Sequence, residues 1–475
     1  MKHQTRIVFI LLLMGLSVTA QEPLRLSLHE ANDYALEHNL SLKNARLNVA
    51  YSDRQVKGTI AQGLPQVDAS LDYMTYFNYE LQFNFGGGGG TGITEEQYTG
   101  IFMDAMGQFP GANPQTILAS SYIETKVQDL INESGSNSIP LTDQSSAKVQ
   151  VGQLLFSGQY WVGIKAARLA KKIAEQGLDN SILDVKESIA SGYYMALVTR
   201  QSLDVFRKNI ENLQAIREHT RRMYEAGVAE QTDVDQISIQ VSMLENTERS
   251  MKRALDMSYS LLRFQLGAEP GTPIELTDDL FAFLAPVNDF NNLPDFQIEN
   301  NVLYQMTGTQ EAISEKMVDM ERWAYSPTLT GFYSYNYKIM RSGFDMNPNH
   351  LAGLTMSIPV FSSGSRKHKL EQAKIQYDQA RLNRELVENQ LVMQEQQLRL
   401  DLQTALENYR AQSENVEVAK RAFQNISNKF DQGLVSSLDL TQANSNYLQA
   451  ETSLIQSMMS LLQAKLSLDK LYNQL

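Results

Sequence analysis

The longest regular pattern of apolar positions lies between residues 370 and 430. Apolar side chains recur there at alternating spacings of three and four residues, with polar interruptions at Arg384, Gln394 and Gln412 and an extra four-residue step from Leu398 to Leu402. Neither proline nor glycine interrupts the run. The set is Leu370, Ala373, Tyr377, Ala380, Val387, Leu391, Leu398, Leu402, Ala405, Tyr409, Val416, Ala419, Phe423, Ile426 and Phe430. Such spacing over so long a stretch predicts a helix that supercoils against a partner helix. At about 1.5 Å per residue, that helix would be roughly 90 Å long.

A period of two residues marks positions 67–85, where nearly every odd position is apolar or aromatic and even positions are mostly polar. This alternation predicts one long strand with an apolar face and a polar face. A membrane-spanning strand needs only about ten residues, so we expect this strand to project beyond the membrane. The five glycines at 86–90 end it, and we interpret 86–146 as an irregular insertion in an external loop. Further strands are predicted at 147–156, 328–339 and 352–360.

Helical periodicity accounts for most of the remaining chain. One amphipathic helix of more than thirty residues is predicted from Leu28 to Gly63. A second long helix is predicted from about 164 to 224, with a break at Gly227 and a restart that runs to Leu266. The other predicted helices cover 301–324 and, after the break at Gly433, about 438–475.

The order of these elements repeats, which indicates an internal duplication. LPQVDASLDY (64–73) aligns with SPTLTGFYSY (326–335), LLFSG (154–158) with PVFSSG (359–364), and YEAGVAEQTDVDQ (224–236) with FDQGLVSSLDLTQ (430–442). Two helical sequences often align by chance. A shared order of helix, two strands, long helix, glycine break and helix rarely arises by chance. The sequence therefore predicts two structural repeats, 21–270 and 295–475, joined by a linker at 271–294 that is rich in proline.

Composition narrows the class of protein. Residues 1–20 have the form of a signal peptide, with a basic start, about ten apolar residues and a cleavage site at Val18-Thr19-Ala20. No other stretch approaches the roughly 18 apolar residues of a membrane helix. The net charge of −13 and the lack of a long basic tract disfavour binding to nucleic acid or to an anionic membrane surface. With no cysteine, the chain has no disulfide, thiolate metal site or cysteine nucleophile.

Four strands with an apolar face cannot lie in a membrane with open edges, because every backbone group there must be paired. Closure therefore requires several chains, and three chains would supply twelve strands, an even number within the range of such barrels. Two alternatives remain at this point. A structural coiled-coil protein of the envelope, anchored by its strands, would have no transport activity, and a soluble periplasmic coiled coil would leave the aromatic strands unexplained.

The segment LSLHEANDYALEHNLSLKNAR at 26–46, the LP and SP entries to the strands, the LFSGQ and FSSGSR turns and the paired glycine breaks resemble the TolC-like outer-membrane efflux channels. The resemblance covers the mature chain except about 86–146. It implies a mixed α and β membrane protein: a homotrimer that shares one 12-stranded outer-membrane β-barrel, continued by a periplasmic tunnel of antiparallel coiled-coil helices. It also implies a periplasmic adaptor and an inner-membrane pump of the RND or ABC type, with this protein as a passive conduit for drugs, metals or secreted polypeptides.

The same resemblance suggests functional residues at the two helix–turn–helix tips. Gly227 and Val228 in the first tip, with Gly433 and Leu434 in the second, would form the edge on which the adaptor docks. Each glycine can equally be a helix C-cap in the left-handed conformation.

Asp233 and Asp439 occupy matching places just after the two breaks. Asp439 would belong to an acidic ring that narrows the tunnel mouth, and Asp233 to the network that holds the mouth shut. Helix N-capping alone also favours aspartate at such positions. The family's second ring aspartate falls on Gln442, and the arginine that pairs with the gate aspartate falls on Val435, so the closed state is expected to be held differently here.

Chemistry of other kinds finds little support. The six histidines lack the spacing of metal ligands, and the chain has no HExxH motif, nucleotide fingerprint or nucleophile elbow. A phosphate-binding loop would need Lys-Ser/Thr after the glycines at 86–90, and none follows. We therefore predict a protein that is not an enzyme and that requires no cofactor, metal or nucleic acid.

Overall fold

The structure is a computed structural model, and it divides the chain into two compact units. Unit 1 contains residues up to 56 together with 166–316 and 372–475, and unit 2 contains 57–165 and 317–371. The predicted signal peptide lies outside the described residues. The residues that the structure describes are 23–75, 77, 80–82, 95–111, 113, 117, 121–134, 138–140, 143–284, 295–340 and 348–475.

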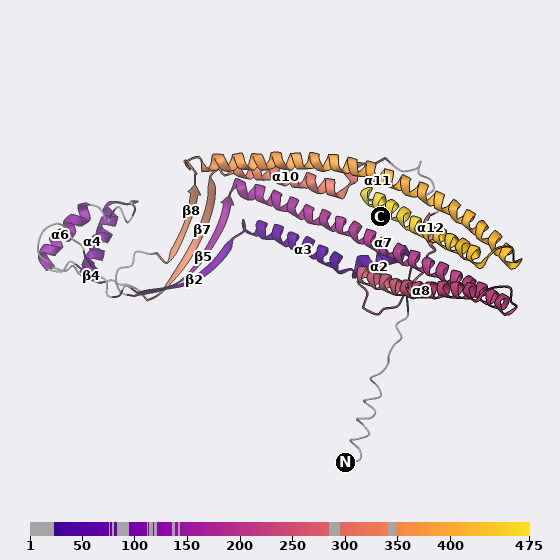
Figure 1. Cartoon of the computed structure of the whole chain (residues 1–475). Helices are drawn as coiled ribbons and strands as arrows, with labels where there is room; N and C mark the ends of the chain where they lie inside the picture. Colours follow the sequence, from indigo (N-terminus) through magenta and orange to yellow (C-terminus); the bar gives the residue numbers. More distant parts are fainter. Residues whose placement is uncertain are drawn as a thin grey trace, which may run out of the picture. The chain divides into compact units, whose positions relative to one another are not determined.

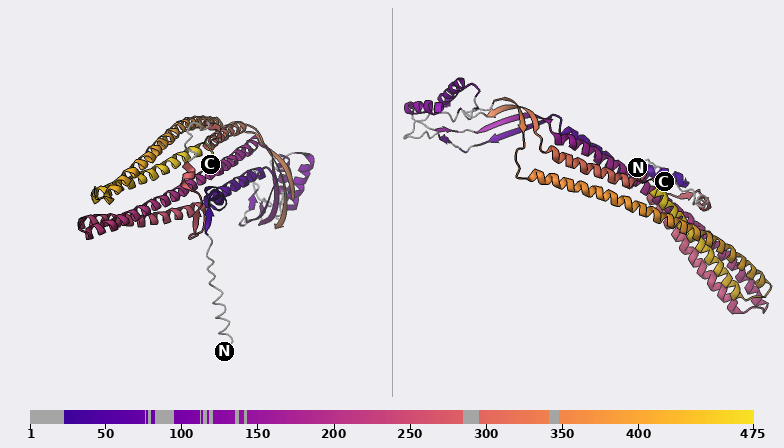
Figure 2. Two further views of the ribbon diagram at one scale, coloured as in Figure 1. Left: turned by 90° about the vertical axis from the view of Figure 1, so that its right-hand side faces the viewer. Right: turned by 90° about the horizontal axis from the view of Figure 1, so that it is seen from above.

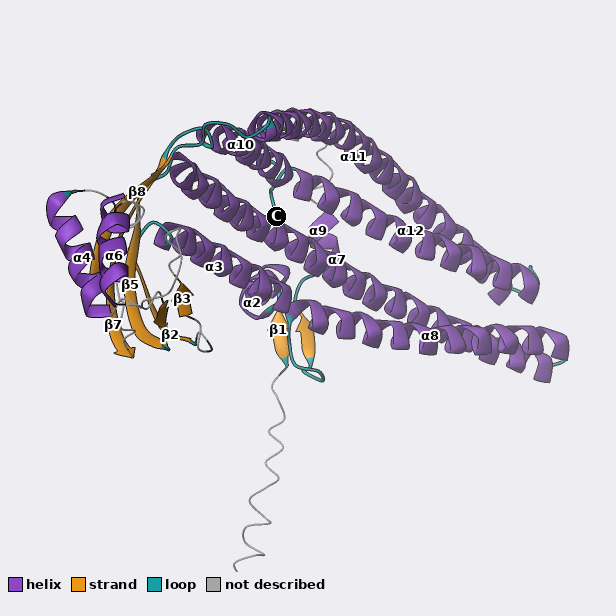
Figure 3. Cartoon of the chain, turned by 90° about the vertical axis from the view of Figure 1, so that its left-hand side faces the viewer, coloured by secondary structure: helices purple, strands orange, loops and turns teal. Residues whose placement is uncertain are grey.

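Unit 2 contains a four-stranded antiparallel sheet, drawn in orange in Figure 3. Its strands, in spatial order, are β2 (Gln66–Met74), β5 (Gln144–Phe156), β7 (Thr328–Met340) and β8 (His350–Ser357). Each predicted repeat thus supplies two strands. The sequence prediction of four strands is confirmed, although β8 ends at Ser357, before Pro359, whose missing N–H cannot join a ladder.

The register places the apolar positions of all four strands on one face of this sheet. Val67 pairs with Val151, which pairs with Tyr333, which pairs with Ala352. The opposite face is polar, and there Ser70 pairs with Lys148, which pairs with Asn336. No Asp, Glu, Lys or Arg lies on the apolar face of the described strands. Its members are Val67, Ala69, Leu71, Tyr73, Ala147, Val149, Val151, Gln153, Leu155, Leu329, Gly331, Tyr333, Tyr335, Tyr337, Ile339, His350, Ala352, Leu354 and Met356.

The single long strand expected at 67–85 is wrong. β2 ends at Met74, Phe77 has a left-handed backbone (φ 48°), and a separate short strand β3 (Glu80–Gln82) pairs with β4 (Ser138–Pro140). An alternating pattern fixes which face a side chain takes, but it carries no signal for a local change of backbone direction. Residues 83–94, the glycine run included, lie outside the described residues.

The expected irregular insertion contains two helices, α4 (Glu95–Gln108) and α6 (Ser121–Ser134), which pack against each other (Figure 1). Tyr98, Ala105 and Val127 are buried between them. Each helix has only about four turns, so the apolar spacing is too short to stand out in a long polar segment.

Unit 1 is helical and contains most of each long helix. Its elements include α7 (Gly158–Glu225), α8 (Gln231–Leu266), α11 (Ser365–Asp431) and α12 (Ser437–Leu471), which form two helical hairpins, α7–α8 and α11–α12 (Figure 2). The first turns of α7 and α11 belong to unit 2. None of the described helices is long and apolar enough to cross a membrane.

The first predicted helix is in fact two helices, α2 (Leu28–His38) and α3 (Leu40–Ala61), because Asn39 is extended (ψ 128°). The Asn39 side chain accepts hydrogen bonds from Ser41 N (2.8 Å) and Leu42 N (3.1 Å), and it donates one to the Gln265 carbonyl (2.6 Å). An asparagine inside an amphipathic pattern gives no strong stop signal, so the periodicity alone misses this break.

An asparagine in the second predicted repeat caps a helix in the same way. Asn301 accepts hydrogen bonds from Leu303 N and Tyr304 N at the start of α10 (Val302–Trp323), and it donates to the Leu471 carbonyl (3.1 Å). In both repeats one buried asparagine therefore starts a helix and ties it to the last turn of a hairpin helix. This agreement in side-chain geometry supports the duplication independently of the sequence alignments.

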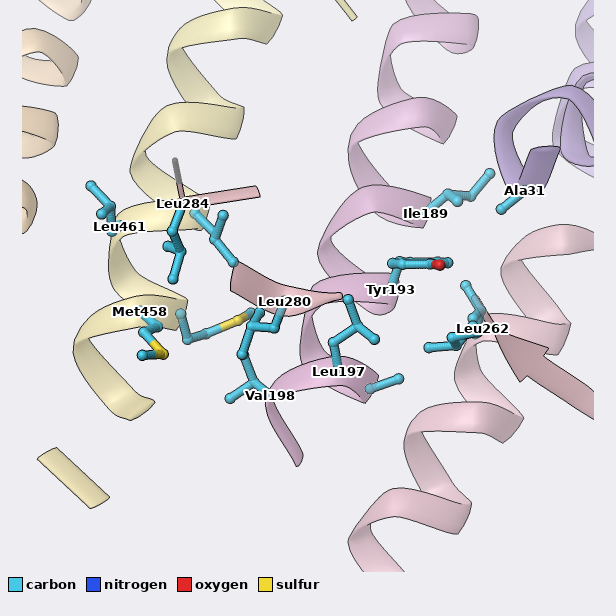
Figure 4. Close-up of a cluster of buried hydrophobic side chains, with 14 of the residues drawn as sticks. Ala31, Ile189, Tyr193, Leu197, Val198, Leu262, Leu280, Leu284, Met458 and Leu461 are labelled. Carbon is cyan, nitrogen blue, oxygen red and sulfur yellow. The ribbon is translucent and has the colours of Figure 1, made fainter. Parts of the chain in front are cut away.

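The core of unit 1 joins α2, α7, α8 and α12 through apolar side chains (Figure 4). Tyr193 lies at its centre, and its hydroxyl oxygen is 3.0 Å from both the Leu26 carbonyl oxygen and Asp278 Oδ2, which share its one proton. Burial raises the pKa of this hydroxyl, which keeps it protonated as a donor.

The first part of the predicted linker at 271–294 contains regular structure. It forms β6 (Ile274–Leu276), parallel to β1 (Leu24–Leu26), and α9 (Leu280–Leu284). Leu276, Leu280 and Leu284 are buried in the core. Elements of three and five residues are too short to show a period, and residues 285–294 lie outside the described residues.

Candidate functional site

Each helical hairpin turns through the same backbone motif. In the first, Gly227 (φ 79°) donates to the Tyr224 carbonyl (2.9 Å) and Val228 donates to the Met223 carbonyl (2.8 Å). The second repeats this pattern from Gly433 (φ 70°) and Leu434 to the carbonyls of Phe430 and Lys429, both at 2.9 Å. These paired bonds define a Schellman C-cap, which requires a residue that tolerates positive φ. The C-cap interpretation of both glycines is confirmed.

The residue after each glycine is left exposed. In a Schellman motif this residue commonly packs against the preceding helical turn. Here the side chains of Val228 and Leu434 are 71% and 67% exposed. The chain therefore presents one bare aliphatic side chain at each tip.

Asp233 and Asp439 both take part in capping boxes. Asp233 Oδ2 accepts the Glu230 N–H (3.0 Å) at the start of α8, and Asp439 Oδ2 accepts the Ser436 N–H (3.0 Å) at the start of α12. Ser436 also donates its hydroxyl to Asp439 (2.7 Å) and accepts the Asp439 N–H (3.2 Å). The hydrogen bonds from Ser436 lower the pKa of Asp439, so the exposed carboxylate stays ionised below the usual range of an aspartate.

The second oxygen of Asp233 makes a contact that joins the two hairpins. The Ser437 hydroxyl donates a hydrogen bond to Asp233 Oδ1. Ser437 is buried and begins α12, so this bond links the N-terminus of α12 to that of α8. No pattern in the sequence points to Ser437, because the partners are 204 residues apart and the aligned position in the first repeat is Gln231.

Two further polar contacts join the hairpins, one well away from the turns and one at the end of α11. Asn209 on α7 and Asn444 on α12 are both buried, and their amides exchange hydrogen bonds at 3.0 and 3.4 Å. His219 Nε2 on α7 lies 3.9 Å from Asp431 Oδ1 on α11, beside a cavity of about 300 Å³. We call the contacts Asn209–Asn444, His219–Asp431 and Asp233–Ser437 the polar seam.

The other predicted aperture residues are placed as follows. Gln442 is exposed on α12, one turn beyond Asp439, and donates to Asn446 Oδ1 (2.9 Å) on the same helix. Val435 is half-buried in the turn and offers no charge to Asp233. The structure thus pairs Asp233 with Ser437 and does not bring it to Val435, Gln442 or Asp439.

The described residues contain no group of three or more His, Asp or Glu side chains placed to hold a metal ion. Exposed carboxylates and bare aliphatic tips can attract cations and bind an apolar surface.

Comparison with known proteins gives relatives of one kind. Outer membrane protein TolC of Vibrio cholerae serotype O1 is 22% identical over 309 residues, which cover 64% of this chain and 70% of that protein. Proteases secretion protein PrtF of Dickeya chrysanthemi is 22% identical over 257 residues, which cover 50% of this chain and 53% of that protein.

Solved structures share the fold. The outer membrane protein VceC of Vibrio cholerae superposes with a TM-score of 0.67 at 14% identity, covering 94% of this chain and 95% of that one. The CmeC outer membrane channel of Campylobacter jejuni gives a TM-score of 0.68 at 13% identity, covering 94% and 85%.

The family profile described as outer membrane efflux protein matches residues 121–268 and 299–474. These two segments, one in each repeat, make up more than half of the chain. The resemblance to TolC-like channels is confirmed, and the chain belongs to the outer membrane efflux protein family, whose members are channels of the outer membrane rather than enzymes.

Proposed function

We propose that three copies of this chain close one twelve-stranded barrel in the outer membrane, continued by a periplasmic helical tunnel. The observation that carries the proposal is the sheet of unit 2, whose apolar face has no Asp, Glu, Lys or Arg in its described strands. Within the described residues, β2 and β8 each pair on one side only. In hydrocarbon such edges must find partners, and the neighbouring copies supply them.

The tunnel is a passive conduit for efflux or type I secretion. A periplasmic adaptor and an inner-membrane pump of the RND or ABC type supply energy and cargo, which are drugs, metals or secreted polypeptides. The names of the relatives, an outer membrane protein TolC and a proteases secretion protein, support both routes equally.

The aperture lies at the two hairpin tips. Asp439 and Gln442 of three copies surround the tunnel axis, and the Asp233–Ser437 hydrogen bond holds the two hairpins of each copy together at the mouth. In this chain a serine hydroxyl takes the place of a basic partner for Asp233. Opening then requires that this bond exchange for bonds to water.

The adaptor docks on Gly227, Val228, Gly433 and Leu434. The support is the pair of exposed aliphatic side chains beside backbone turns that satisfy their own carbonyls. Burial of such side chains gives an interface a favourable apolar centre.

Planar-bilayer recording of the protein purified from outer membranes tests the conduit. We expect discrete channels of low conductance that favour cations. A sealed protein with no conductance under any condition would contradict the conduit and favour a structural role in the envelope.

Photo-crosslinking in living cells tests the docking edge. A photoreactive residue in place of Leu434 should capture a periplasmic adaptor, identified by mass spectrometry. The matched control replaces Leu400, a leucine of α11 that is 57% exposed against 67% for Leu434, and should not capture the adaptor. Capture of the adaptor at both positions, or at neither, would argue against docking at the tips.

A further inference from the structure

We propose that the start of α11 binds anionic phospholipid at the periplasmic surface of the outer membrane. The surface consists of Val360, Phe361, Arg366, Lys367 and Lys369, and we call it the junction patch. The inference rests on the proposed barrel, because that proposal brings the ends of the strands to the membrane surface.

The apolar part of the junction patch follows β8 directly. Val360 is 90% exposed and Phe361 85%, the first and third highest values among the exposed aliphatic and aromatic side chains of the described residues. The chain then turns through Ser363 (φ 50°) and Gly364 (φ 82°) into α11. Two bare apolar side chains at the end of a membrane strand fit the boundary between headgroups and acyl chains.

The charged part occupies the first two turns of α11. Lys367 and Lys369 are exposed and form no ion pair with any other described residue. Glu371 is the only carboxylate between residues 365 and 371, and it lies 3.6 Å from His368. Two exposed lysines with no ion-pair partner among the described residues therefore follow the two apolar side chains within eight residues of Phe361. Their long side chains can reach a headgroup from either side of the helix, and a cluster of this composition attracts an anionic headgroup.

Arg366 has a different part in this arrangement. Its guanidinium donates to the Pro359 carbonyl (2.8 Å) and lies 5.6 Å from the centre of the Tyr325 ring. Arg366 thus ties the segment that bears Val360 and Phe361 to the start of the helix. The two lysines remain available for the headgroup.

The first repeat gives independent evidence that the junction patch lies at the interface of the membrane with water. When Gly158 is aligned with Gly364, Trp161 falls on the position of Lys367. The chain has two tryptophans, Trp161 and Trp323, both in unit 2 and 58% and 44% exposed. Tryptophan and lysine are the residue types that gather at the interface of a membrane with water. The duplicated positions therefore mark one interfacial level.

The whole-chain charge of −13, which disfavours contact with anionic membranes in general, conceals this local excess of positive charge. Electrostatic attraction to a headgroup acts over about a Debye length, so the nearby charges decide binding.

The two tryptophans provide the measurement. The full-length protein is reconstituted into phosphatidylcholine vesicles that contain phosphatidylglycerol, with bromine on the acyl chains of one lipid or the other. Quenching of tryptophan fluorescence then gives the relative affinity of the two lipids. We expect a preference for phosphatidylglycerol of about fivefold per lysine, which Lys367→Gln with Lys369→Gln removes.

The matched control is Lys420→Gln with Arg421→Gln, an exposed basic pair near the other end of the same helix. It should keep the preference of the wild type. Quenching with an unchanged preference in the Lys367/Lys369 variant would overturn the inference and leave the barrel standing. No quenching by either brominated lipid would overturn the membrane placement of unit 2 itself, and the proposed function with it.

Discussion

The helices of unit 1 meet in two chemically different ways. In the core around Tyr193, α7, α8 and α12 are joined by buried leucine, isoleucine and methionine side chains. Along the polar seam, the two hairpins are joined by an amide pair, a histidine beside a carboxylate, and a serine bonded to Asp233. Each hairpin keeps its own apolar contacts near the seam, as at Leu213, Ile237 and Val241 between α7 and α8.

The apolar contacts of the core and the hydrogen bonds of the polar seam differ in what it costs to break them. Exposing buried apolar surface costs free energy, because water forms no interaction with it that compensates the loss. A hydrogen bond between side chains is replaced by bonds to water at a net cost of only about 1 kcal/mol. The hydrogen bonds of the polar seam can therefore exchange with water at less cost than the core contacts, although parting there also separates the rings of His219 and Phe430, whose centroids lie 5.8 Å apart.

The largest effect is expected in the core. Leu262→Ala should reduce the free energy of unfolding by about 2–5 kcal/mol, because Leu262 is fully buried and its loss leaves a cavity. Leu261, its neighbour, is 45% exposed, and Leu261→Ala should cost much less. Urea unfolding followed by circular dichroism measures the unfolding free energy of both variants. Equal losses would show that burial of Leu262 in the core does not determine stability.

The next effect concerns the buried amide pair. Asn444→Leu leaves the Asn209 amide without its partner, and should cost about 1–3 kcal/mol of unfolding free energy. The double variant Asn209→Leu/Asn444→Leu restores complementarity and should cost less than the two single variants together. A double-mutant cycle measures this coupling energy. Strictly additive losses would show that Asn209 and Asn444 do not stabilise each other.

A smaller effect on stability, with a functional readout, is expected at the mouth. Ser437→Ala removes the hydrogen bond to Asp233, and should raise the conductance of the closed channel in planar bilayers. Ser238→Ala is the control, since that hydroxyl bonds only to the Val234 carbonyl of its own helix. If Ser437→Ala conducts like the wild type, the seam does not hold the mouth closed.

The smallest effect is electrostatic. Asp439→Ala should make the channel less selective for cations. Since Ser436 lowers the pKa of Asp439, selectivity should persist as the pH falls through the usual aspartate range and disappear only below it. In Ser436→Ala the pKa returns towards its ordinary value, so selectivity should be lost at a higher pH. Reversal potentials measured across a pH series give the pH at which each protein loses its selectivity. Loss at the same pH in the wild type and in Ser436→Ala would contradict the prediction.

The sequence predicts the long elements well, because a helix such as α11 repeats its apolar spacing over many turns and the sheet alternates strictly. It misses the break at Asn39, where a single side chain caps a helix, and it misses α9, which is shorter than two turns. Gly227 and Gly433 are found because positive φ selects for glycine. Ser437, Asn209 and Asn444 are not found, since contacts between segments more than 200 residues apart leave no local pattern.

The two Schellman turns have a consequence for how this chain can change over generations. Each turn closes its own carbonyls through backbone bonds, so its shape depends on the glycine and not on the side chain that follows. Val228 and Leu434 are thus free to vary without altering the hairpins that carry them. Under the proposed docking at the tips, two surface substitutions would change the partner while the hairpins behind them keep their fold.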